Sequence, residues 1–232
     1  MKDSLAKISQ AIDPRSTVKS INTRRTIQKL ADQLGLVYFG AVDQRDDEHR
    51  LIRGMTTSNT HRDDHYCVGT FQSYDVAITI RSDHLHYPDK RIKHHEWTIV
   101  TVDLKTSYEL PHMFIAHDSI REMLLAKYSS LAPVILDSRP QNQGFPEQFT
   151  LFSDISKIVE IEGLLTPNIT GSISTTFGDL AIEIVDNTIL LYSSEAHPSK
   201  HQLEIMLKNG IWLAEKLDES ARRVYNPPED SI

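Results

Sequence analysis

The sequence predicts an α+β protein whose largely antiparallel sheet is accompanied by a helix near each end of the chain. Segments that alternate apolar and polar residues, as half-buried strands do, follow one another through the middle of the sequence. Segments with apolar residues three and four positions apart, typical of amphipathic helices, lie mainly near the two ends. Because helices and strands do not alternate regularly, a doubly wound parallel sheet is not expected.

The N-terminal helical segment, residues 1–35, contains an expected helix at 17–34. Its apolar stripe consists of Ile27, Leu30, Ala31 and Leu34, and Gly35 follows at the position of a C-terminal cap. Residues 36–42 are apolar and predict a buried strand. Residues 43–65 are rich in Asp, Arg, Thr, Ser, Asn and His, and they predict a long irregular connection.

The strands are expected at 66–71, 75–81, 97–104, 113–116, 149–152, 180–185 and 188–192. Val76, Ile78 and Ile80 alternate with more polar residues, so we expect them to point into a core that the C-terminal helix covers. Asp186-Asn187 separates the last two strands and predicts a two-residue hairpin turn.

The remaining segments predict short helices at 119–128, around 155–161 and from Pro167 onward. Residues 132–146 hold three prolines and predict a loop. This loop is the one candidate internal boundary in a chain that we otherwise expect to form a single domain, residues 1–232.

The C-terminal helix, expected at 198–224, is apolar on more than one face. Its main stripe contains Leu203, Met206, Leu207, Gly210, Leu213, Ala214 and Leu217. Ile205, Ile211 and Trp212 lie off that stripe, which predicts an interface with a protein partner, most simply a second copy of the chain. In that interpretation Gly210 lets two backbones approach closely. Alternatively, the N-terminal helix covers this face within the same chain.

Composition narrows the classes of partner. The chain has 25 basic and 32 acidic residues, a net charge of −7, which argues against a nucleic-acid partner. The one short basic run, residues 90–95, predicts a solvated turn. No apolar stretch has the length of a membrane span, and no signal peptide is evident, so we expect a cytoplasmic protein with no membrane partner. The single cysteine, Cys67, excludes an internal disulfide.

Nine of the eleven histidines lie between residues 49 and 117. Some of these histidines, together with a neighbouring aspartate, are candidate ligands of a divalent metal. They are His61, Asp63 or Asp64, His65, His84 and His86. His84 and His86 would share one face of a strand. The alternative is that residues 61–65 form a polar, solvated loop without a metal.

Part of the chain, roughly residues 66–220, resembles a bacterial family known only as a domain of unknown function, many of whose members are membrane-anchored. The similar segments are 68–71, 76–80, 97–102, Leu110-Pro111, Phe149, 164–167 and 181–192. The resemblance implies a shared architecture and assigns no catalytic residue. The family's membrane anchors have no counterpart in this sequence.

The sequence contains no phosphate-binding glycine loop, dinucleotide fingerprint or nucleophile elbow. We therefore expect a non-catalytic binding or scaffold domain that needs no cofactor. The alternative is a metal-dependent hydrolase that uses the His/Asp cluster between residues 61 and 95.

Overall fold

The computed structural model of the chain describes residues 14–42, 62–86, 92–118, 131–136 and 144–227. Ten strands form one sheet in the order β1-β3-β4-β5-β10-β9-β6-β8-β7, and β2 also pairs with β3. The strands are β1 (Val37–Tyr38), β2 (Ala41–Val42), β3 (Arg62–Phe71), β4 (Tyr74–His86), β5 (Ile92–Asp103), β6 (Met113–His117), β7 (Ala132–Val134), β8 (Phe149–Ser153), β9 (Ala181–Val185) and β10 (Thr188–Ser193). Every pair is antiparallel. The predicted α+β fold is confirmed.

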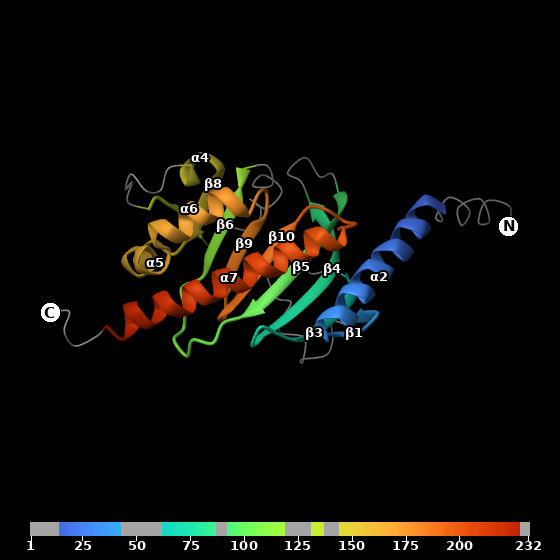
Figure 1. Cartoon of the computed structure of the whole chain (residues 1–232). Coiled ribbons are helices and arrows are strands. Elements are labelled where there is room, and N and C mark those ends of the chain that lie inside the picture. Colours follow the sequence, from blue (N-terminus) through green and yellow to red (C-terminus); the bar gives the residue numbers. More distant parts are fainter. Residues whose placement is uncertain (1–13, 43–61, 87–91, 119–130, 137–143, 228–232) are drawn as a thin grey trace.

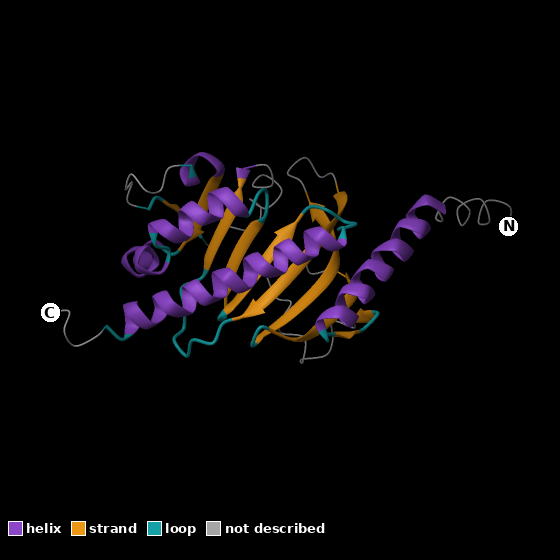
Figure 2. Ribbon diagram, in the orientation of Figure 1, coloured by secondary structure: helices purple, strands orange, loops and turns teal. Residues whose placement is uncertain are grey.

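The helices are α2 (Pro14–Leu34), α4 (Phe145–Gln148), the 3-10 helix η4 (Ile155–Lys157), α5 (Ile158–Leu164), α6 (Pro167–Thr176) and α7 (Lys200–Tyr225). Helices α2 and α7 lie across the same face of the sheet (Figures 1 and 2). Helix α7 begins at a capping box, in which Ser199 and Gln202 each bond the other's backbone N–H. Among the described residues, no helix is both long enough and apolar enough to cross a membrane.

Two tight turns fix the register of the hairpins. Gln72 and Ser73 connect β3 to β4, and Asp186 and Asn187 connect β9 to β10, all four with positive φ. Asn187 also holds the segment that precedes β6: its side chain accepts from the N–H of Leu110 and donates to two carbonyl groups of the same segment. The hairpin predicted at Asp186-Asn187 is thus confirmed.

The main core lies between the sheet and the helices. Val76, Ile78 and Ile80 are at most 5% exposed and belong to the same apolar cluster as the main stripe of α7, as predicted. At Gly210, helix α7 lies close to the sheet, because a Cβ there would lie 2.9 Å from Val102 Cγ2 and 3.4 Å from Leu191 Cδ1. The expectation that Gly210 faces a second copy is therefore wrong; it faces β5 and β10.

The opposite face of the sheet has its own buried cluster. It contains Trp97, Ile99, Phe114, Ala116, Phe152, Ala181, Leu190 and Tyr192. Polar groups interrupt this cluster, among them Arg81 and Glu183, both fully buried. A buried charge is costly unless it is paired, so these two side chains identify places where the chain has built specific polar contacts.

Two elements differ from the sequence prediction. Residues 36–42 form two strands of two residues each rather than one buried strand, and Val37 and Phe39 are about half exposed, because the segment lies at the edge of the sheet. The predicted loop 132–146 begins with strand β7, whose Pro133 is tolerated because β7 is the opposite edge strand. Strand β7, at the start of this segment, pairs with β8, which follows its end. The helix predicted at 119–128 lies outside the described residues.

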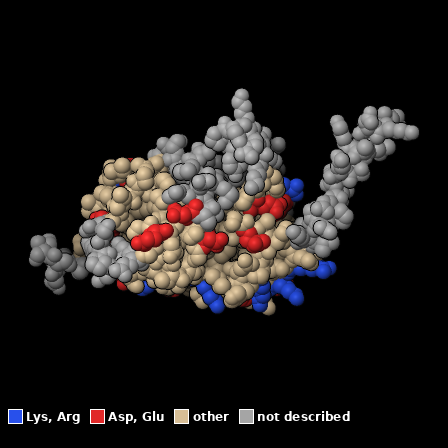
Figure 3. Space-filling model, turned by 90° about the horizontal axis from the view of Figure 1, so that it is seen from above, with Lys and Arg blue, Asp and Glu red and all other residues tan. Residues whose placement is uncertain are grey.

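The surface reflects the net charge. Asp and Glu side chains spread over the centre of the face seen from above, and Lys and Arg lie along its border (Figure 3). No continuous band of basic side chains crosses the described part of this face.

Candidate functional site

The predicted metal ligands are distributed over two neighbouring strands. Asp64 and His65 lie in β3, and His84 and His86 lie in β4, where the backbone of His84 pairs with that of His94 in β5. His61 lies outside the described residues. Within the described part of the chain, no three His, Cys, Asp or Glu side chains gather closely enough to hold a metal ion.

Asp63 lies in the strand rather than in a solvated loop, which corrects the interpretation of residues 61–65. Its carboxylate is buried and accepts two hydrogen bonds from the guanidinium of Arg81, Nε to Oδ1 at 2.7 Å and Nη2 to Oδ2 at 2.8 Å. The two residues are directly paired between β3 and β4. Such a bidentate pair holds both charges in one geometry, so Asp63 serves as a structural anion here.

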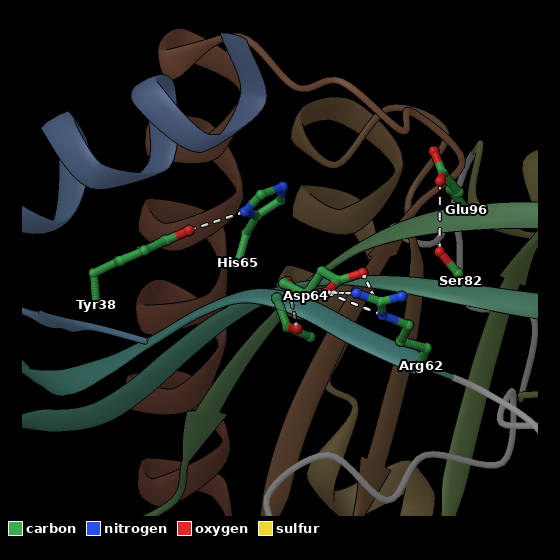
Figure 4. A network of polar contacts seen from close by, with 7 residues as sticks. Tyr38, Arg62, Asp64, His65, Ser82 and Glu96 are labelled. Atoms are coloured by element: carbon green, nitrogen blue, oxygen red, sulfur yellow. Dashed lines mark hydrogen bonds and ion pairs between the residues drawn. The ribbon is translucent and has the colours of Figure 1, made fainter. Parts of the chain in front are cut away.

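His65 sits in an irregularity of β3. The register with β4 shifts between Asp64 and Cys67, and His65 has φ 57°, in the left-handed region that side chains rarely adopt. The bulge directs the imidazole toward Tyr38 of β1, and Nδ1 lies 2.9 Å from the tyrosine hydroxyl oxygen (Figure 4). Burial lowers the pKa of His65, with the neighbouring Asp64 acting in the opposite direction.

Asp64 and Glu96 point elsewhere. Asp64 accepts from Arg62 at 3.1–3.2 Å, and Glu96 accepts from Ser82 at 3.4 Å (Figure 4). His65 therefore faces a tyrosine and not a carboxylate ligand set, and the geometry serves to join β1 to the β3 bulge.

Cys67 follows the bulge and is fully buried in the main core. Burial raises the pKa of its thiol to about 12. A thiol that stays protonated at neutral pH is a weak nucleophile, so Cys67 acts as a small apolar core residue.

A polar cavity lies at the start of β6, toward the end of the molecule where α7 finishes. It has a volume of about 720 Å³, and its walls come from residues 109–112, 131–132, 153–155 and Lys157. Tyr225, the last residue of α7, reaches this region through its hydroxyl, which donates to the carbonyl of Glu109 at 3.5 Å. Glu109, His112, Asp154 and Lys157 give the cavity charged and titratable groups.

One wall of this cavity contains a histidine held by a buried carboxylate. His112 Nε2 lies 2.9 Å from Oε1 of Glu183, a residue of β9 that is fully buried. The hydroxyl of Tyr192 in β10 donates to the other oxygen, Oε2, at 2.7 Å. The imidazole itself is 28% exposed. Glu183 of β9 and Tyr192 of β10 thus orient one partly exposed ring, just before β6, at the edge of a cavity.

Neither His112 nor Glu183 was predicted from the sequence as a site residue. They are 71 positions apart, so no local spacing connects them. A signal was nevertheless present: Glu183 is the only charged residue in the apolar strand Ala181–Val185, and a buried carboxylate needs a partner. The sequence shows the need for a partner, whereas only the sheet order shows which residue supplies it.

The second apolar face predicted for the C-terminal helix is only partly present. Ile211 is 2% exposed and belongs to the main core, so its assignment to an interface is wrong. Trp212 is partly buried against Phe177 of the α6 end, with ring centroids 6.2 Å apart. Ile205 remains 38% exposed. Phe177, the C-terminal cap of α6, therefore covers the part of this face at Trp212, where a second copy or α2 was expected.

Comparison with known proteins yields a similarity of fold. No family model and no curated protein matches the sequence. Among solved structures, the mycobacterial trehalose monomycolate transport factor A, TtfA, superposes with a TM-score of 0.58 at 12% sequence identity. The match covers 86% of this chain and 94% of that one. This chain is therefore similar to TtfA in fold over most of its length.

Proposed function

We propose that this chain is a non-catalytic binding domain and that its ligand site is the cavity in front of His112. The observation that carries the proposal is an imidazole that is 28% exposed, held by the fully buried Glu183, on the wall of a cavity of about 720 Å³. Cavities with a few convergent, oriented polar groups are the usual sites of small ligands.

Three further observations favour binding over catalysis. Ser153 is the one hydroxyl-bearing side chain on the described cavity wall, and its Oγ donates to the backbone carbonyl of His112. The buried Cys67 belongs to the core on the other side of the sheet. The structural neighbour is named as a transport factor, and that name describes no reaction.

The test uses three probes of similar size that share one hydroxyl and differ in charge: ethanolamine, ethylene glycol and glycolate. Each is titrated to high millimolar concentration at pH 7.5 against the 15N-labelled full chain, and the backbone amide shifts of His112, Ala132 and Asp154 are followed. We expect at least one probe to give saturable shifts at these amides.

A matched pair of variants locates the binding. Ala132 lines the cavity, whereas Ala196 lies in the loop before α7; both are partly exposed. Ala132→Phe narrows the cavity and should abolish saturation, and Ala196→Phe should leave it unchanged. If none of the three probes saturates, or if Ala132→Phe binds as well as the unmodified chain, the proposed function is wrong.

A further inference from the structure

The tautomer of His112 decides what its ring offers to the cavity. When Glu183 is ionised, its carboxylate only accepts hydrogen bonds, and the hydrogen in this contact then lies on Nε2 of His112. In the neutral ring, Nδ1 then carries a lone pair. No hydrogen bond joins Nδ1 to another of the described residues, and the His112 side chain is 28% exposed. The cavity wall therefore presents an acceptor, which calls for a ligand with a polar N–H or O–H.

The charges around the cavity select among such ligands. Glu109 and Asp154 are acidic and exposed on its wall. Lys157 is the one lysine or arginine on the described wall, and its ammonium lies 3.1 Å from Oε2 of Glu160, which offsets its charge. The balance is acidic, so a positively charged ligand is attracted and an anion is repelled.

We propose that the cavity binds a small organic ammonium ion, whose N–H groups donate to Nδ1 of His112 and whose charge is balanced by Glu109 and Asp154. This inference rests on the proposed function and adds the ligand class to it. Glu183 and Tyr192 act as positioning residues, because they fix the tautomer and direction of the ring without reaching the ligand.

The charge series described above tests the ligand class. Ethanolamine should bind at least tenfold more tightly than ethylene glycol, and glycolate should bind least. If ethylene glycol or glycolate binds saturably with an affinity equal to or higher than that of ethanolamine, the ammonium proposal is wrong, but the proposal of a binding domain still stands. If none of the three probes binds, both the ammonium proposal and the proposal of a binding domain are wrong.

Two substitutions test the residues. His112→Gln keeps an N–H that can reach Glu183 and removes the Nδ1 acceptor, so it should weaken ethanolamine binding about tenfold with little change in melting temperature. Asp154→Asn keeps the oxygen that accepts from the N–H of Ser156 and removes one charge. It should weaken ethanolamine binding and leave that of ethylene glycol unchanged.

A control variant separates an effect at the cavity from a general effect of removing one surface charge. Asp179→Asn removes an exposed charge between α6 and β9, outside the cavity wall, and should leave ethanolamine binding unchanged. If the His112→Gln variant is unstable, the affinities of the three probes for the Asp154→Asn variant still show whether the site requires a positively charged ligand. Unaltered ethanolamine affinity in either cavity variant would overturn the assignment of its residue.

Discussion

Asp218 should be one of the most important single side chains for the stability of the fold. This residue of α7 is 3% exposed. Its carboxylate accepts from the hydroxyl of Tyr74 at 2.9 Å and from the N–H groups of Lys105 at 3.1 Å and Thr106 at 2.9 Å. It thereby connects the helix to the start of β4 and to the segment that follows β5.

Asp218→Ala leaves three donors without their acceptor. At about 1–3 kcal/mol for each buried donor, and with water able to reach the half-exposed segment at Lys105, the expected loss in free energy of unfolding is about 3–5 kcal/mol. Tyr74→Phe removes only one of these donors and keeps the ring in place, so it should cost about 1 kcal/mol.

Urea unfolding at pH 7 measures both losses, and the double variant completes a thermodynamic cycle. We expect a coupling of about 1 kcal/mol between Tyr74 and Asp218, because the same hydrogen bond is lost in each single variant. A loss below 1 kcal/mol for Asp218→Ala would refute the reasoning, as would strict additivity in the cycle.

Three other predictions concern single positions. Because burial lowers the pKa of folded His65 below its unfolded value, its contribution to stability is full above about pH 6.5 and is lost as the pH falls. His65→Asn suits the left-handed backbone and can still bond Tyr38, so it should reduce the drop in melting temperature between pH 7.5 and 5.5; an unchanged drop contradicts this. Gly210→Ala should destabilise the chain by about 1 kcal/mol in urea, since crowding against Val102 outweighs the gain in helix propensity, and a more stable variant would disprove the close approach. Cys67 should react with iodoacetamide only in the unfolded chain, so rapid labelling under native conditions would count against its burial.

Local patterns in the sequence were sufficient to predict most helices and strands of the fold. The alternation of Val76, Ile78 and Ile80 predicted both the strand and its buried face, because side chains of a strand alternate between the two faces of a sheet. Asp186-Asn187 predicted the last hairpin, since both residues tolerate positive φ. These features depend on neighbours within a few positions.

The site depends on contacts that local patterns do not contain. Asp63 was interpreted as part of a polar loop, because its ion-pair partner Arg81 is 18 positions away in another strand. The bulge at His65 was not predicted either: its backbone geometry follows from the pairing of β3 with β4 and from the contact with Tyr38. The contact between His112 and Glu183 requires β6 to lie beside β9, and this order is a property of the whole sheet.

The position of α7 in the chain has a consequence for synthesis and folding. Strands β5 and β10 pair through residues 85 to 95 positions apart, and Gly210 of α7 lies over that pair, between Val102 and Leu191. Contacts between such distant segments form late, because closing a long loop costs chain entropy. Since α7 follows all ten strands, the strands leave the ribosome before the helix that covers them. The nascent chain therefore exposes the apolar face of its sheet until α7 has been made, and this is the interval in which we expect it to be most prone to aggregation.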